Sequence, residues 1–431
     1  TMASPAFVAY AKQGSSDLAV GTLSNPGSPV WEDTLSDQHD YPRVPCTAGG
    51  INNVRTRTGV KGQPLFFSEY GIGSAVDLWR AARHFEQEHA EGSEDAQYLR
   101  DKLDRFLADW KDWRLDETFA RPEDFFMASL KKMAGQRTLC LNAIRSNPNI
   151  VAHNLTGAND HVLCGEGLTT LFRELKPGTI DAIFDGWYPL RWCLFAESAH
   201  IAKGGTVHLE AVLANEDVLA PGDYPAHLQV IGPRMTRAME RTFTVTIPPR
   251  TGATNEPPFA KLWFSEDVAI NGPAGEYTFL ATFERGAAAA GGSTTFYVSD
   301  PADLPSVSAE AVLWGDDPKT AQWLTAHGVH TRSFVPGAPS AKREVILAAP
   351  KAPAPGGAAA FRELAARMAA GSTVVFLSPE VFAQGDRPTA WLPLKEKGTA
   401  KPIRGWLYLK DEWSKAHPIF DGLPSGGLMD Y

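Results

Sequence analysis

The feature that most constrains the fold of this chain is a change of hydrophobic period along it. Between about residues 17 and 192, buried runs such as PLFFSEYG (64–71) alternate with stretches of helical spacing. From about 195 to 300 the period becomes two, as in TVHLEAVL (206–213), and after 304 the first pattern returns. Runs that alternate with helices predict parallel βα units, whereas a period of two predicts an antiparallel sandwich.

Composition excludes several classes of protein. The 431 residues exceed one ordinary domain, and 41 Lys+Arg against 50 Asp+Glu give a net charge of −9, so no basic field attracts nucleic acid. No apolar run approaches the length of a membrane-spanning helix. The four cysteines, Cys46, Cys140, Cys164 and Cys193, lack metal-type spacing. We expect buried free thiols, no metal and no organic cofactor.

One carboxylate, Glu69, ends an apolar run in the stretch PLFFSEYGIGS, where glycines follow it. A strand core excludes an unpaired glutamate, because burying its charge costs several kcal/mol or shifts its pKa. Glu69 therefore either lies in solvent where the strand simply ends, or belongs to a functional site. This stretch alone leaves both interpretations open.

Further polar residues are expected near Glu69. The segment DQHDYP follows a short predicted strand, so His39 and Tyr41 come at the C-terminal end of that strand. In a parallel α/β barrel, the side chains at the C-terminal ends of the strands gather on one rim. We therefore predict that His39, Glu69, and Asn154 or Asp160 converge there. The alternative for His39 is a loop histidine with local hydrogen bonds only.

The order DQHDYP and then PLFFSEYGIGS resembles the catalytic barrel of glycoside hydrolase family 2, the β-galactosidase, β-glucuronidase and β-mannosidase group. In that family a segment of the first kind ends the sixth barrel strand, and a Glu in the second context ends the seventh and is the nucleophile. The resemblance implies a retaining β-glycosidase with Glu69 as nucleophile. It also implies substrate contacts from His39 and Tyr41, and from Asn154 and Asp160 near the eighth strand.

The resemblance implies three domains. Residues 1–194 would be the C-terminal half of a (β/α)8 TIM barrel, residues 195–303 an antiparallel immunoglobulin-like β-sandwich, and residues 304–431 a flavodoxin-like α/β domain. The last resembles a truncated glutamine-amidotransferase-like module, of the kind seen as a β-galactosidase trimerisation domain. Because the last cysteine, Cys193, precedes it, that module lacks an amidotransferase nucleophile. It would serve assembly or substrate approach, which leaves a homo-oligomer open.

The chain departs from the family pattern at the acid/base residue. The family carries it in an Asn-Glu pair before the nucleophile, whereas the pairs here, Asn215–Glu216 and Asn255–Glu256, follow Glu69. Glu32 precedes Glu69 but lacks the preceding Asn. We therefore expect a fragment that is inactive by itself, with the acid/base Glu in a missing N-terminal part.

Two rival functions stay open. One is a non-catalytic carbohydrate-binding or assembly protein on the same scaffold. The other is a glycosidase of another barrel family, with Glu69 as acid/base. If the protein is a glycosidase, we expect its partner to be an oligosaccharide, polysaccharide or glycoside substrate. We expect neither nucleic-acid binding nor a membrane span. The compartment is unknown from this chain, with a periplasmic or secreted location favoured.

Overall fold

The computed structural model describes residues 2–3, 36–42, 44–251, 258–303, 307–337, 343–353, 356–392, 395–396, 413–414 and 427–428. The chain is a multidomain mixed α/β protein with two compact units, Thr1–Pro301 with Ile403–Tyr431, and Ala302–Pro402. The apolar run DLAVGTLS (17–24), which the alternating pattern predicts as a further strand, lies outside the described residues, as do Glu32 and the pair Asn255–Glu256.

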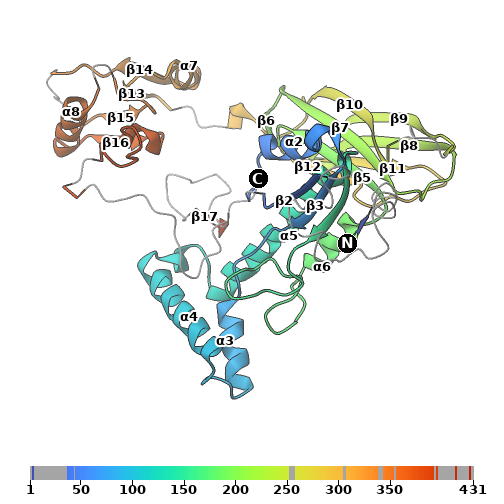
Figure 1. The fold of residues 1–431 in the computed structure, drawn as a ribbon. Helices are drawn as coiled ribbons and strands as arrows, with labels where there is room; N and C mark the ends of the chain where they lie inside the picture. Colours follow the sequence, from blue (N-terminus) through green and yellow to red (C-terminus); the bar gives the residue numbers. More distant parts are fainter. Residues whose placement is uncertain are drawn as a thin grey trace. The chain divides into compact units, whose positions relative to one another are not determined.

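Three parallel strands form the α/β part of the first unit (Figure 1). They are β2 (Ser36–Asp40), β3 (Leu65–Tyr70) and β4 (Ile150–Leu155), in that spatial order, and β1 (Met2–Ala3) pairs antiparallel with β4. Helix α2 (Ala48–Thr56) returns the chain from β2 to β3. Parallel strands joined by helical crossovers are the components of a half-barrel.

The strand that carries His39 differs from its prediction. The sequence places a strand before DQHDYP, whereas β2 includes SDQHD, so His39 lies within the strand and not in a following loop. The physical reason is that these polar residues complete their backbone hydrogen bonds by pairing with β3. Tyr41 follows directly after the strand ends.

The connection from β3 to β4 contains three helices, α3 (Leu78–Gln87), α4 (Glu94–Asp112) and α5 (Pro122–Ser146). Figure 1 shows α3 and α4 projecting from the sheet as a pair, while α5 returns to it. The apolar residues of α4 recur at helical spacing, and they form a buried cluster with α3 and the start of α5. Ser93 caps the N-terminus of α4, and its hydroxyl accepts a hydrogen bond from the Ala96 amide.

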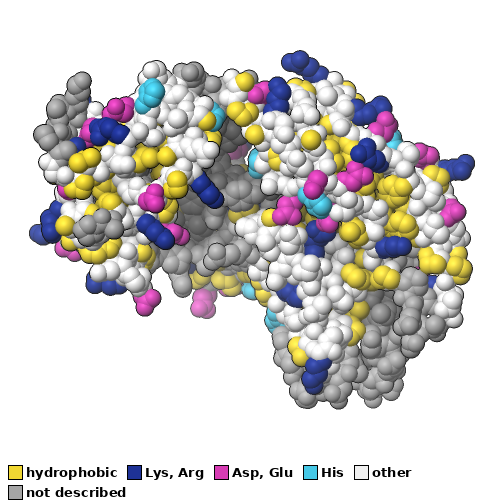
Figure 2. Space-filling view, turned by 90° about the horizontal axis from the view of Figure 1, so that it is seen from above, with side chains coloured by type: hydrophobic (Ala, Val, Ile, Leu, Met, Phe, Trp, Pro, Cys, Tyr) yellow, Lys and Arg dark blue, Asp and Glu magenta, His cyan; other side chains and the backbone are white. Residues whose placement is uncertain are grey.

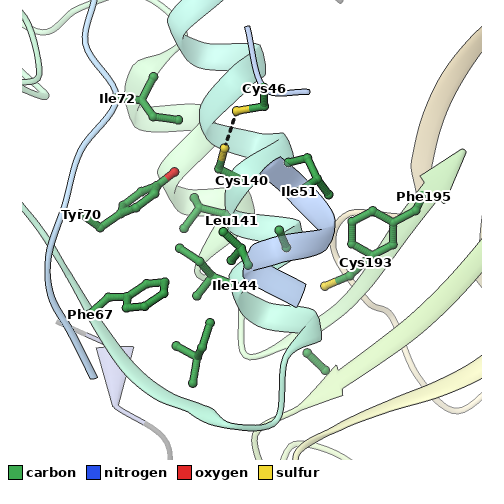
Figure 3. Close-up of a cluster of buried hydrophobic side chains, with 14 of the residues drawn as sticks. Cys46, Ile51, Phe67, Tyr70, Ile72, Cys140, Leu141, Ile144, Cys193 and Phe195 are labelled. Carbon is green, nitrogen blue, oxygen red and sulfur yellow. Dashed lines mark hydrogen bonds between the residues drawn. The ribbon is translucent and has the colours of Figure 1, made fainter. Parts of the chain in front are cut away.

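Helix α5 was not specifically predicted, and its burial gives the reason. An amphipathic stripe marks a helix with one solvent face, whereas most of α5 is enclosed. Its buried residues include the charged side chains Lys132, Arg137 and Arg145, which interrupt any apolar stripe. The helix packs against the sheet, with Leu141 and Ile144 in the same core as Phe67 (Figure 3).

The predicted antiparallel sandwich is present as two sheets with a shared core. The larger sheet pairs five strands in the order β6-β12-β11-β8-β9, all antiparallel except for β6 with β12. The smaller sheet has the order β10-β7-β5. The strands are β5 (Leu190–Glu197), β6 (His200–Ala202), β7 (Thr206–Asn215), β8 (Gly222–Ile231), β9 (Arg237–Ile247), β10 (Ala260–Ala269), β11 (Gly275–Phe283) and β12 (Ser293–Ser299).

Strand β5 joins the sandwich to the α/β part, because it is buried on both faces. Trp192 and Leu194 enter the sandwich core, whereas Cys193 and Phe195 enter the core formed with α5 and α2. The predicted boundary between residues 194 and 195 falls inside this strand. A strand buried on both faces holds both layers together. Its sequence is then largely a continuous apolar run, without alternation of apolar and polar residues.

The second unit is a parallel α/β sheet in the order β14-β13-β15-β16. This order is that of the first four strands of the flavodoxin-type doubly wound sheet. Its elements are β13 (Ala309–Trp314), α7 (Pro318–Ala326), β14 (Val329–Ser333), β15 (Val345–Ala348), α8 (Ala358–Ala369) and β16 (Thr373–Phe376). The amidotransferase-like assignment remains a prediction.

We predict that Phe106→Ala destabilises the α3–α4–α5 region by about 3–5 kcal/mol, because it empties a fully buried ring position. Phe106 lies 5.0 Å from the ring of Phe126 and 5.6 Å from that of Trp110. Urea unfolding followed by tryptophan fluorescence measures the change. Tyr98→Ala, at an exposed position of the same helix, is the control and should cost under about 1 kcal/mol. Equal losses in the free energy of unfolding for the two variants would contradict the packing described.

Candidate active site

Glu69 lies at the C-terminal end of β3, outside the core that buries the rest of that strand. Leu65, Phe67 and Tyr70 all belong to the core formed with α5, although strict alternation would place Tyr70 on the opposite face from the other two. The pairing with both neighbouring strands shows why, since β3 contains one extra residue between Phe67 and Tyr70. This β-bulge reverses the alternation, so Glu69 does not enter that core.

The same bulge sets the partner of Glu69 on the next strand. Gln38 pairs with Phe67, and the following residue of β2, His39, pairs with Glu69. The bulge thus absorbs Ser68 and places an imidazole beside a carboxylate. Both side chains are about one-third exposed, at 31% for His39 and 32% for Glu69.

One oxygen of Glu69 receives both close polar contacts. His39 Nδ1 lies 3.1 Å from Glu69 Oε2, and the Tyr41 hydroxyl donates to the same Oε2 at 2.5 Å. The Tyr41 oxygen also lies 3.3 Å from Thr156 Oγ1, on the segment that follows β4. An O–H···O⁻ bond of this length is in the strong, charge-assisted range. The two contacts fix the position of this carboxylate oxygen.

Tyr41 remains a proton donor under ordinary conditions. Burial, and then its hydrogen bond to Glu69, raise the pKa of Tyr41 to about 12. The contact with Thr156 acts in the opposite direction and is smaller. Because the phenol keeps its proton at neutral pH, Tyr41 stays uncharged and donates a hydrogen bond to the carboxylate.

The two candidates after β4 differ in their surroundings. Asn154 lies near Glu69, because its side-chain amide donates to the Ser68 carbonyl at 3.2 Å. Asp160 is buried, and it accepts hydrogen bonds from Lys176 Nζ and from the Gly167 amide, each at 2.9 Å. Burial raises the pKa of the Asp160 carboxyl, although Lys176 opposes this. The observed contacts of Asp160 fasten a loop, and sugar contacts for it and Asn154 stay predictions.

The structure adds a second buried carboxylate that sequence reasoning missed. Glu166 lies against the backbone of Gly71, where an added Cβ would come within 2.5 Å of Glu166 Oε2. The Glu166 charge also contributes to raising the pKa of Tyr41. In the sequence, this glutamate stands between two glycines in the segment CGEGL. In the structure, neither glycine has room for a side chain. A glutamate between two such glycines indicates a closely packed loop.

Asp37, two residues before His39, brings a further carboxyl group to this end of the sheet. Both of its carboxylate oxygens are buried, and burial raises the pKa of the Asp37 carboxyl. His39 acts in the opposite direction through its charge. The described part of the site is therefore rich in carboxyl groups, with the imidazole of His39 among them.

No metal site stands out in the described ranges, where no group of three or more His, Cys, Asp or Glu side chains could hold an ion. Within those ranges, too, no helix has the length and apolar character needed to cross a membrane. On the face drawn in Figure 2, acidic and basic side chains are interspersed, without one continuous basic patch.

Comparisons with known proteins gave structural neighbours only. No protein-family model matches the chain, and no curated protein matches it by sequence. Among solved structures, the β-D-mannosidase from Dictyoglomus thermophilum has a TM-score of 0.34 and 12% identity, over 61% of this chain and 30% of that one. The Bacteroides uniformis β-glucuronidase has a TM-score of 0.21 and 10% identity, over 64% of this chain and 26% of that one.

A glycosyl hydrolase family 2 member from Bacteroides cellulosilyticus has a TM-score of 0.18 and 10% identity, over 25% of this chain and 15% of that one. These structural neighbours are glycoside hydrolases. The chain spans less than one-third of the length of each of these three enzymes.

We predict that Gly71→Ala destabilises the first unit by about 1–3 kcal/mol, because the new methyl group collides with the Glu166 carboxylate. Glu166→Ala removes the colliding atoms, so the double variant should be more stable than the sum of the single changes predicts. Urea unfolding of the four proteins measures this coupling. Gly49→Ala, in α2 with open space around it, is the control and should be neutral or stabilising. Additive effects of the two changes would contradict the contact.

Proposed function

We propose that this chain supplies the nucleophile of a retaining β-glycosidase of the family 2 type, with Glu69 as the nucleophile. The observation that carries the proposal is the pair of contacts from His39 and Tyr41 to one oxygen of a carboxylate at the end of a parallel strand. Hydrogen bonds donated to a carboxylate favour its charged form, and the charged form is the one that attacks. The acid/base glutamate is assigned to a part of the enzyme outside this chain.

The proposed reaction has two displacement steps. In the first, a carboxylate oxygen of Glu69 attacks the anomeric carbon, while the acid/base group gives a proton to the departing oxygen. In the second, the same group takes a proton from water, which attacks the anomeric carbon and releases Glu69. Since the described contacts of Glu69 fall on Oε2, we assign the attack to Oε1.

His39 and Tyr41 have a defined part in this scheme. They hold Oε2 in place, so that the carboxylate faces the sugar in one orientation. Less conformational entropy is then lost on reaching the transition state. As the covalent ester forms at Oε1, Oε2 becomes its carbonyl oxygen and keeps the hydrogen bond from Tyr41. Asn154 fixes the β3 backbone next to the nucleophile through its bond to Ser68. Asp160 is proposed as a sugar contact, although Lys176 and the Gly167 amide already donate to its Oδ1.

We predict that Glu69 becomes covalently labelled when the full-length enzyme that contains this chain is treated with a 2-deoxy-2-fluoro glycoside. Glu69→Gln should abolish the label and lower kcat by on the order of 10⁴-fold. Peptide mass spectrometry locates the label, and hydrolysis of nitrophenyl glycosides measures kcat. Glu117→Gln is the control, because Glu117 has the same 32% exposure and lies on the surface of a helical turn.

Each contrary result identifies a rival function. An active enzyme that carries the label on a different carboxylate would show that Glu69 is not the nucleophile. An active enzyme that resists labelling, and in which Glu69→Gln is rescued by a substrate with a good leaving group, would assign Glu69 as acid/base. Carbohydrate binding without hydrolysis of any tested glycoside would favour the non-catalytic protein.

We predict that Tyr41→Phe lowers kcat of the full-length enzyme by about 10²-fold with little change in KM, because it removes one donor to the reacting carboxylate. Because the pKa of Tyr41 is raised to about 12, Tyr41 stays protonated well above neutral pH. The alkaline limb of the pH–rate profile should therefore keep its position in the variant. Tyr98→Phe, another exposed tyrosine, is the control. A shift of that limb in Tyr41→Phe would contradict the assignment.

A further inference from the structure

Two of the four cysteines meet inside the core of the first unit. Cys46 Sγ and Cys140 Sγ lie 2.8 Å apart, although the residues are 94 positions apart in sequence. Figure 3 shows Cys46 on the segment that precedes α2 and Cys140 on α5, with the two side chains directed toward each other. Both are buried, at 8% exposure for Cys46 and 3% for Cys140.

The surrounding contacts fix this meeting in place. The Cys46 backbone amide donates to Gln136 Oε1 at 2.7 Å, and Gln136 lies one helical turn before Cys140 on α5. The pair shares its core with Ile51, Tyr70 and Ile72 (Figure 3). Two segments that are already joined by a hydrogen bond from a backbone amide to a side chain lose little further freedom when their sulfurs become bonded.

The other buried cysteine of this core provides a contrast. Cys193 on β5 is fully buried, and Figure 3 places it beside Phe195, away from the two paired sulfurs. Cys164 lies in the loop after β4 and is only half-buried. The geometry therefore singles out one pair of the four cysteines. Cys193 is the control for a buried thiol outside the pair, and Cys164 is the control for a more exposed thiol.

We propose that Cys46 and Cys140 are a site of covalent modification, at which a small-molecule disulfide joins them into an intramolecular disulfide. In the first step the Cys46 thiolate attacks one sulfur of oxidised glutathione, which gives a mixed disulfide and releases one glutathione thiolate. The Cys140 thiolate then attacks the Cys46 sulfur and releases the second glutathione. The two protein thiols lose two protons and two electrons, and the glutathione disulfide is reduced to two thiols.

The order of these steps follows from the environment of each thiol. Cys46 is the more exposed of the two and lies on a segment between secondary-structure elements, whereas Cys140 lies inside a helix. The hydrogen bond with Cys46 and burial raise the pKa of the Cys140 thiol well above its usual range. Cys140 therefore reacts second, once the oxidant has already reached its partner.

The test uses the purified chain, incubated with oxidised glutathione and, in a second arm, refolded from denaturant in a glutathione buffer. Free thiols are then alkylated in denaturant, and the digested peptides are identified by mass spectrometry. We expect a Cys46–Cys140 cross-linked peptide and an intact mass lower by two hydrogens. The oxidised protein should also melt higher than the reduced one by on the order of 5 °C.

Variants separate the site from a general effect of oxidation. Cys46→Ser and Cys140→Ser should lose both the cross-link and the oxidative rise in melting temperature, whereas Cys193→Ser keeps both. Glutathione attached to Cys164 reports that the oxidant acted on the protein. Full alkylation of Cys46 and Cys140 in both arms, or a cross-link that involves another cysteine, overturns the proposal.

Discussion

The interaction on which the proposed site depends is the parallel pairing of β2 with β3, including the bulge at Ser68. Without the extra residue, Glu69 would share a face with Phe67 and would enter the apolar core against α5. With it, Tyr70 takes the core position, and Glu69 comes opposite His39. A single inserted residue thus turns a destabilising buried charge into a carboxylate that is held by hydrogen bonds.

The sequence alone predicted the parts of this arrangement that depend on pattern. An apolar run that ends in a glutamate indicated the strand end, and the rule that parallel strands end at one edge grouped Glu69 with His39, and with Asn154 or Asp160. The bulge was not predictable, because Phe67-Ser68-Glu69 carries no glycine or other signal of an extra residue. Nor was the partner of Asp160, because the Lys176 ammonium reaches it only when the loop after β4 is folded.

Helix α5 accounts for most of what pattern could not show. Its buried polar residues bind segments that are distant in sequence, so their role appears only in the folded chain. Arg137 donates to the Ile72 carbonyl at 2.9 Å and also to the Glu166 carbonyl. Ser129 accepts a hydrogen bond from the Ala75 amide at 2.8 Å. A helix that satisfies the backbone of surrounding loops needs polar side chains inside, which is why it lacks an apolar stripe.

These contacts show that α5 packs against, and hydrogen-bonds to, the segments that follow both strands of the site. The segment after Glu69 is fixed by Arg137 and Ser129, and the segment after Tyr41 is fixed by Gln136 and adjoins Cys140. On the far side, Arg145 of α5 pairs with Glu216 of the sandwich at 3.1 Å, with both side chains largely buried. Because removing one partner of such a pair leaves an uncompensated charge, the helix cannot shift without cost. The pairing of β2 with β3 sets the positions of His39 and Glu69 relative to each other, and the segments that follow both strands are held by a helix that contributes no residue to the proposed chemistry.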